Sequence, residues 1–190
     1  MSPLIIVGII VLVLVLYVWS LYNGLVTLKM RIDEAWSQID VQLKRRADLI
    51  PNLVETVKGY AKHEKSIMTA VTDAHKAMLG ATSLAAKAKA SDVLSGALGK
   101  LLAIAENYPQ LKANDGFIQL QKELSDTEDK VAYSRQYYNS SVLEFNTKIR
   151  VFPNSMLASS FGFTDKEFFG ASEAEREPVK VNFEPRSVPA

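Results

Sequence analysis

Cysteine is absent from this 190-residue sequence, and its absence excludes several kinds of chemistry. A chain without thiols forms no disulfide, ligates no Fe–S cluster or zinc through sulfur, and has no cysteine nucleophile. Histidine is nearly as scarce, since only His63 and His75 occur. Twelve residues along a helix turn two side chains about 120° apart, so we expect these imidazoles to lie separately on the surface. The sequence therefore predicts neither a metal site nor a cofactor.

Recognisable catalytic and nucleotide-binding motifs are also missing. The sequence has no GxSxG, P-loop or GxGxxG pattern, and the HEKSI stretch at 63–67 lacks the second histidine of a zinc-protease helix. Glu64 nevertheless falls within an apolar stripe, where a buried carboxylate would be costly and often functional. Alternatively, Glu64 lies at the edge of that stripe, and Lys62 and Lys65 keep it in water. We predict no catalytic residue and no enzymatic activity.

A large net charge of either sign is lacking too, because 22 Lys and Arg against 21 Asp and Glu leave a formal charge of +1. This balance gives no indication of a nucleic-acid partner. Charge is unevenly placed, however, since no charged residue precedes Lys29 and the run Pro3–Trp19 is almost entirely apolar. About 20 such residues in a helix span the ~30 Å hydrocarbon core of a bilayer. The sequence therefore predicts a single-pass transmembrane anchor at 1–24, with the lipid bilayer as a partner.

The flanks of this run favour an uncleaved anchor over a signal peptide. No Lys or Arg precedes it, and its far end is bulky where a cleavage site requires small residues. Tyr17, Trp19 and Tyr22 are then expected at the membrane–water interface, where amphipathic rings gather.

Basic residues follow the anchor, beginning with Lys29 and Arg31, and none precedes it. This asymmetry predicts an anchor in the cell inner (cytoplasmic) membrane with the remainder of the chain in the cytoplasm. Because Asp33 and Glu34 dilute the positive charge, an extracytoplasmic position for the rest of the chain is the alternative.

Beyond the anchor, apolar residues recur every three or four positions from Leu25 to Met78, as in an amphipathic helix. Pro51 removes one helical hydrogen bond, yet the apolar stripe keeps its phase through it. Pro51 therefore marks either a bend in a continuing helix or a restart with Asp48 as N-cap. The stripe ends near Gly80, and the small, basic stretch 81–91 is expected to form a tip connection or a frayed helix start.

Two further helices are predicted. The first carries Leu94, Leu98, Leu101 and Ala105 and must stop before Pro109. The second has the clearest pattern of the chain, a heptad seam whose members alternate in steps of three and four. Those members are Phe117, Leu120, Leu124, Thr127, Val131, Ser134, Tyr138, Ser141, Phe145 and Ile149.

Pro153 ends the last long helix, and the segment after it is too short for another. Its phenylalanines are expected to fold back as an aromatic hook at 154–170, because exposed they would form an apolar patch. The tail 171–190 contains Pro178, Pro185 and Pro189 and is expected to be extended. No strand pattern occurs. The predicted fold is all-α, with an anchor leading into an elongated antiparallel bundle of three to four helices at 25–153.

Polar residues cluster at three places within this bundle and form the candidate site. One group flanks Pro51, a second follows the third helix in the motif AENYP, and a third lies on the last helix, where Arg135 and Asn139 share a face. They could form a pocket or a surface for partner proteins, or they could be caps and interhelical hydrogen bonds. The residues are Arg45, Arg46, Asp48, Asn52, Glu106, Asn107, Tyr108, Arg135, Tyr138, Asn139 and Asn146.

Four stretches together resemble the LemA family of bacterial membrane proteins: RRADLIPNLVETVKGYA (45–61), AENYPQLKAN (105–114), YYNSSVLEFN (137–146) with VFP after it, and FGF (161–163). The resemblance runs from the anchor to Phe169. It implies one N-terminal span followed by a helical bundle. It also implies a protein without enzymatic activity, because members of the family are not known as enzymes. It also implies links to membrane-associated proteolysis, envelope stress and, in one branch, organelle-membrane biogenesis.

These observations predict a membrane-anchored scaffold or adaptor that presents a rigid bundle to membrane proteins, among them a membrane protease system, in envelope or membrane-protein homeostasis. A homo-oligomer that organises the membrane by self-assembly is the alternative. A ligand sensor that uses the Arg45, Arg46 and Arg135 groups is a further one.

Overall fold

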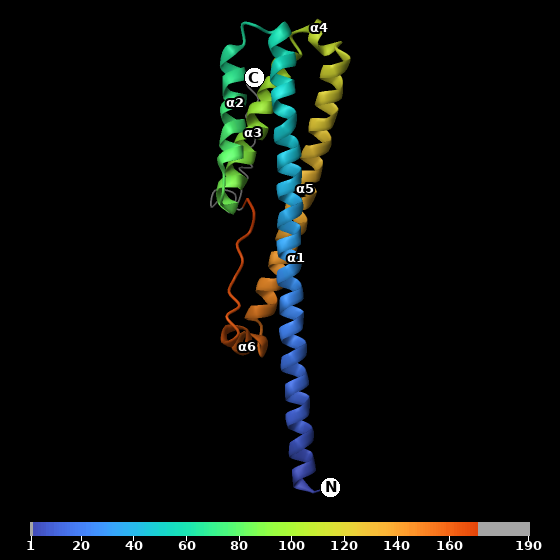
Figure 1. Ribbon diagram of the computed structural model, residues 1–190, viewed down its shortest axis with the longest axis vertical. Helices are drawn as coiled ribbons and strands as arrows, with labels where there is room; N and C mark the ends of the chain where they lie inside the picture. The colour runs from blue at the N-terminus through green and yellow to red at the C-terminus, as the bar shows by residue number, and fades with distance from the viewer. Residues whose placement is uncertain (1, 171–190) are drawn as a thin grey trace, which may run out of the picture.

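One helix, α1, extends from Pro3 to Tyr60 and forms the long axis of the molecule (Figure 1). The computed structural model describes residues 2–170, so the predicted tail at 171–190 lies outside the described residues. At 1.5 Å per residue the 58 residues of α1 extend for about 87 Å. Pro51 lies inside this helix, which excludes a helix restart at Asp48.

Five shorter helices follow, and the described residues contain no strand, which confirms the all-α prediction. They are α2 (Lys65–Gly80), α3 (Leu84–Ala105), α4 (Pro109–Lys112), α5 (Asp115–Arg150) and α6 (Asn154–Ser160). Because the connections are short, α1, α2, α3 and α5 alternate in direction (Figure 1).

Local chemistry explains where several of these helices begin and end. The Ser83 hydroxyl accepts a hydrogen bond from the Ala86 N–H at the start of α3, and the Asn114 side chain accepts one from Phe117 at the start of α5. Each side chain satisfies an N–H group that has no partner in the first helical turn. Pro109 occupies the first turn of α4, where its missing N–H costs nothing.

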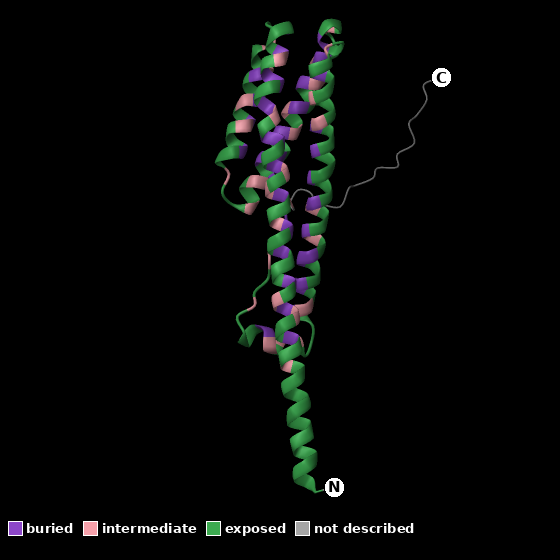
Figure 2. Ribbon diagram, turned by 45° about the vertical axis from the view of Figure 1, so that its right-hand side comes forward, coloured by how far each residue is buried: buried purple, intermediate pink, exposed green. Residues whose placement is uncertain are grey.

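The predicted apolar stripes form the core. Nine of the ten members of the heptad seam are buried on α5, and Leu120 is half-buried. They meet a buried row on α1 that begins at Leu21 and continues to Val57. In Figure 2 the buried residues accordingly gather above the bare lower part of α1, which carries exposed apolar side chains from Leu4 to Leu16.

One expectation about the path of the chain is wrong. The helix through Pro51 ends at Tyr60, and a turn at 61–64 reverses the chain before α2, because Ala61 leaves the helical conformation. Of the two alternatives for 81–91, the structure shows a helix start, since α3 begins at Leu84. The α2–α3 turn thus lies partway along α1, and the distal end of the rod is formed by the 61–64 and 106–114 connections (Figure 1).

The rod therefore has two parts. The distal part is a four-helix bundle of α1, α2, α3 and the first half of α5. In the proximal part the long helices of the described residues are α1 and the second half of α5, with α6 at its lower end, because α2 and α3 are too short to reach it. There a non-helical segment at 161–170, which we call the strap, lies back along the helix pair.

Candidate functional site

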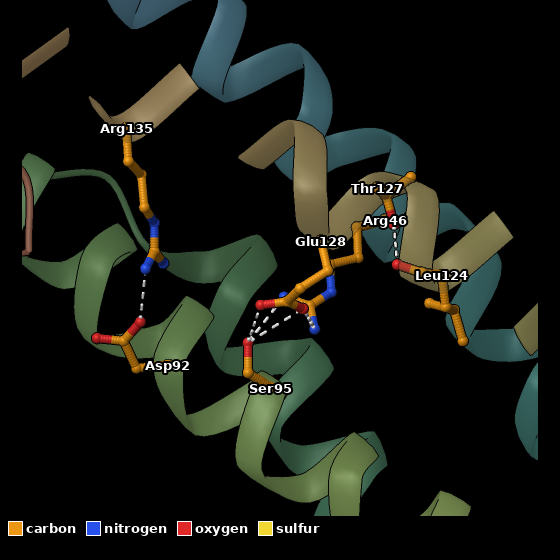
Figure 3. A network of polar contacts seen from close by, with 7 residues as sticks. All are labelled: Arg46, Asp92, Ser95, Leu124, Thr127, Glu128 and Arg135. Atoms are coloured by element: carbon orange, nitrogen blue, oxygen red, sulfur yellow. Dashed lines mark hydrogen bonds and ion pairs between the residues drawn. The ribbon is translucent and has the colours of Figure 1, made fainter. Parts of the chain in front are cut away.

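The first cluster of polar side chains joins three helices inside the distal bundle (Figure 3). Arg46 on α1 is buried, with only 3% of its surface exposed. Its guanidinium donates a 2.9 Å hydrogen bond to the Ser95 hydroxyl on α3 and forms an ion pair with Glu128 on α5. Ser95 in turn donates to Glu128 over 3.1 Å. One arginine thereby links α1, α3 and α5.

The electrostatics of Arg46 reflect its burial. Removal from water lowers the pKa of the guanidinium, and the nearby Glu128 carboxylate opposes that change. Arg135 lies close enough to lower the pKa of Arg46 further. A buried charge of this kind is costly without a partner, so Glu128 offsets the cost of burying the Arg46 guanidinium in the bundle.

Arg135 forms the second link, from α5 to Asp92 on α3 (Figure 3), and it also contacts the strap. Its guanidinium lies 3.0 Å from an Asp92 carboxylate oxygen and 4.8 Å from the centre of the Phe169 ring. The Nε atoms of both arginines are buried and have no hydrogen-bond partner among the described residues. Both guanidinium groups are nevertheless paired with carboxylates, so neither is a ready site for an anionic ligand.

The third polar feature is a pair of asparagine clamps that hold the strap. Asn146 donates to the Lys166 carbonyl and accepts from the Lys166 N–H, both over 2.8 Å. Asn139, seven residues earlier on α5, does the same with Phe169, over 3.0 and 2.8 Å. Seven residues are two helical turns, so both amides face the same groove. Each clamp thus binds the backbone N–H and carbonyl of one strap residue.

Tyr138 contacts the strap between the two clamped residues, Lys166 and Phe169. Its hydroxyl donates to the Glu167 carbonyl over 3.0 Å, and burial together with Glu167 and Asp33 raises the pKa of Tyr138. The Trp36 ring on α1 packs against Tyr138 and against Phe169, with ring centres 6.3 and 6.1 Å apart. The polar contacts thus fix the backbone, and the aromatic rings exclude water.

The AENYP cluster lies apart from the other two, at the distal end. Tyr108 donates to Glu64 over 3.2 Å, and burial, reinforced by the Glu64 charge, raises the pKa of Tyr108. Glu64 is half-buried, so the structure places it at the edge of the core. Glu106 and Asn107 are exposed, and the described residues give their side chains no hydrogen bond or ion pair.

The residues predicted around Pro51 do not act together. Only Arg46 points into the core, whereas Arg45, Asp48 and Asn52 are exposed and their side chains make no hydrogen bond within residues 2–170. A helix of 3.6 residues per turn places neighbouring residues about 100° apart, so adjacent arginines cannot share one environment.

Sequence reasoning missed the carboxylates that pair with the arginines. Ser95 and Glu128 lie 49 and 82 positions after Arg46, and Asp92 lies 43 positions before Arg135, so no local spacing reveals these pairs. It also missed a basic groove of about 780 Å³ at the distal end, lined among others by Lys58, Lys62, His63, Lys65 and Lys76.

His75 lies on α2, and no group of three or more His, Asp or Glu able to hold a metal occurs among the described residues.

Sequence comparison relates the chain to known proteins. The chain is 28% identical to magnetosome protein MamQ of Magnetospirillum gryphiswaldense, over 83% of this chain and 68% of that protein. It is 27% identical to protein LemA of Metamycoplasma hominis, over 84% of this chain and 74% of that protein. The model of the LemA family matches residues 35–183, which include the arginine network and both clamps. The chain therefore belongs to the LemA family.

Proposed function

We propose that the chain is a membrane-anchored scaffold that holds its helical bundle in a fixed orientation to bind partner membrane proteins. The observation that carries this proposal is the continuity of α1. The same helix supplies an apolar segment of membrane-spanning length and, from Leu21 onward, a buried row of the bundle core. A helix shared in this way leaves no flexible linker between bilayer and bundle.

The membrane anchor is supported by exposure as well as by composition. Among the described residues one helix, α1, is long and apolar enough to cross a bilayer. Its large apolar side chains from Leu4 to Leu16 are 47 to 81% exposed. Exposed apolar area costs about 25 cal/mol per Å², so this stretch requires a lipid environment. Following the basic flank, we place the anchor in the inner membrane and the bundle in the cytoplasm.

A surface suited to a protein partner lies on the α1–α5 pair. A groove of about 550 Å³ is lined by Gln38 and Gln42 of α1 and by Tyr133 of α5, with charged residues at its rim. Tyr133 is 70% exposed. An exposed aromatic ring with a polar rim is typical of protein interfaces, where tyrosine is enriched. We propose this groove as the docking surface, with a membrane protease system as one candidate partner.

We propose no catalytic role for the protein. Both buried arginines are paired with carboxylates, and the clamps bind backbone of the same chain. These contacts assign the polar cluster to positioning helices and the strap.

A photocrosslinking residue, p-benzoylphenylalanine, at Tyr133 tests the docking surface in native membranes. The matched control places it at Ala103, which is exposed on α3. We expect adducts with another membrane protein at position 133 and none at 103. An adduct with the mass of two copies would instead support self-assembly, and equal labelling at both positions would contradict the docking surface.

The basic groove supports a second candidate function, the binding of an anionic ligand. Four lysines, His63 and Asp73 line it, among other residues. Lys58 pairs with Glu55 and Lys76 with Asp73, which leaves Lys62 and Lys65 as the lysines without an ion pair among the described residues. Thermal shift with inorganic phosphate and polyphosphate tests it. Stabilisation that is lost in Lys62→Gln and Lys65→Gln, but kept in Arg135→Gln, is the expected result for such a site.

A further inference from the structure

At the base of the bundle, residues 151–163 carry an apolar surface that faces away from the core. From here on, the hook means these residues, which include α6 and the first part of the segment predicted at 154–170. Its inward residues are Ala158, which is buried, and Leu157 and Phe163, which are half-buried against the core. The outward ones remain in contact with the surroundings, with exposed fractions of 79% for Phe152 and 66% for Met156. A short segment with apolar side chains on both faces is unsuited to water.

The charge pattern of this segment points to the same environment. No Asp, Glu, Lys or Arg occurs from 151 to 164. The two charged residues that flank this stretch pair with each other, since Arg150 donates two hydrogen bonds to Asp165 over 3.0 and 2.8 Å. Ser159 and Ser160 donate their hydroxyls to the Met156 carbonyl. The polar groups of the hook are therefore largely satisfied within the chain, as a medium of low polarity requires.

Contacts with α1 fix the height of the hook along the rod. Tyr17 donates a 2.8 Å hydrogen bond to Asn154, and the Tyr22 ring packs edge-on against Phe161 with centres 5.2 Å apart. Phe161 also closes a groove of about 510 Å³ whose other lining residues lie on α1 between Leu14 and Tyr22. In Figure 1 α6 accordingly lies beside α1 below the bundle.

The length of the apolar part of α1, compared with the thickness of a bilayer, indicates that the hook lies against lipid. Twenty residues counted from Pro3 end at Tyr22 and span about 30 Å, the thickness of the hydrocarbon core. Tyr17 lies five residues before Tyr22, or about 8 Å, within that length. A bilayer that covers the apolar part of α1 must therefore also reach α6. The Lys148 ammonium, near the end of α5, lies at the level of Gly24, where an added Cβ would be 3.1 Å from Nζ.

We propose that the hook, residues 151–163, is a second membrane contact that inserts Phe152, Met156 and Phe161 into the interfacial layer of the bilayer beside α1. The partner is the lipid surface itself, contacted by acyl-chain and glycerol regions. The hook sets the depth and tilt of the rod, because an anchor with two points of contact cannot rotate freely about its axis. This inference rests on the proposed membrane anchor.

The absence of cysteine makes the test direct. Single cysteines at Met156, Ile10 and Ser140 are spin-labelled in the full chain, which is reconstituted into vesicles of phosphatidylcholine and phosphatidylglycerol. Power saturation compares collisions with oxygen, which enriches in lipid, and with a water-soluble nickel complex. Ile10 reports the anchor, and Ser140, exposed on α5 about 15 Å above Arg150, reports water.

We expect the oxygen-to-nickel ratio at Met156 to exceed that at Ser140 severalfold and to approach the value at Ile10. A lipid-like ratio at Ile10 with a water-like ratio at Met156 would overturn the inference and leave the anchor intact. Water-like ratios at both would refute the anchor itself. A label at Phe152 provides a second position, so that a local disturbance at Met156 does not decide the result.

Discussion

The distal and proximal parts of the rod bury the apolar faces of α1 and α5 in different ways. In the distal part, four helices surround a core that includes the ion-paired Arg46. In the proximal part, α1 and α5 lack two neighbours, and the strap covers them with Phe169 and backbone hydrogen bonds to Asn139 and Asn146. A strap can open without unfolding the helices beneath it, whereas a helix of the distal bundle cannot leave alone. We therefore expect global stability to depend on the distal part and local opening on the proximal one.

The largest effect is expected for Phe169→Ala in the proximal part. Phe169 is 2% exposed, and truncating a buried phenylalanine costs about 3–5 kcal/mol. Because the strap is held locally, we expect this loss to appear as opening of 163–169, with faster hydrogen exchange there and unchanged exchange in α3. Glu167→Ala, at an exposed position of the same strap, serves as the control. Equal acceleration throughout the bundle would refute the division into two parts.

Next in size is Glu128→Ala in the distal part. It leaves the Arg46 guanidinium buried with Ser95 as its remaining partner, which we expect to cost about 3 kcal/mol of global stability. Urea unfolding of the full chain in detergent, followed by circular dichroism, measures this cost.

Replacement of the buried charge itself provides the comparison. Arg46→Met removes the charge and keeps the volume, so we expect a smaller loss than for Glu128→Ala. Arg45→Ala, at the exposed neighbouring position, should change nothing measurable. If Arg46→Met lowers the free energy of unfolding more than Glu128→Ala does, an unpaired buried charge is not the cause of the loss.

A smaller effect is expected for Asn139→Ala. It leaves the N–H and carbonyl of Phe169 without their partners, at a cost of about 1–3 kcal/mol to strap closure. In a Phe169→Ala background the same change should cost little more, because the strap is already open. A double-mutant cycle by hydrogen exchange measures this coupling. If the effects of Asn139→Ala and Phe169→Ala on the free energy of strap opening are fully additive, the two residues do not hold the strap together.

Acid should loosen the lower end of the strap. The hydrogen bonds from Arg150 lower the pKa of Asp165 and raise that of Arg150. A carboxyl whose folded pKa is lowered contributes stability above its ordinary pKa of about 4, and that contribution is lost as pH falls through the lowered folded value. We expect exchange at 163–166, corrected for intrinsic rates, to rise in that range. Asp165→Asn should remove this pH dependence, and an unchanged profile in that variant would contradict the assignment.

The smallest effect is expected for Arg31→Ala. Arg31 and Glu144 join α1 and α5 in the proximal part, but their side chains are 44% and 55% exposed. Exposed pairs of this kind contribute about 0–1 kcal/mol. A change in the urea midpoint as large as that of Glu128→Ala would mean that surface charge, and not the strap, stabilises the proximal part.

The sequence by itself determined the helices, because their signals are local. The 3–4 spacing predicted the buried rows of α1 and α5, and the uncharged run predicted a segment able to span a bilayer. The same spacing did not reveal the turn at 61–64, since the stripe keeps its phase from Val57 to Val71 whether or not the helix is continuous. Periodicity reports which side chains face inward and is insensitive to a reversal of the chain.

Only the tertiary structure decided which polar residues meet. The sequence singled out Arg46, Arg135, Tyr138 and Asn139 by type and by family pattern, but their partners are Glu128, Asp92 and the backbone of the strap. Contacts between residues 20 to 82 positions apart depend on helix lengths and turn positions, which no short window of sequence contains. The strap crosses the proximal part because α2 and α3 end too soon to cover it.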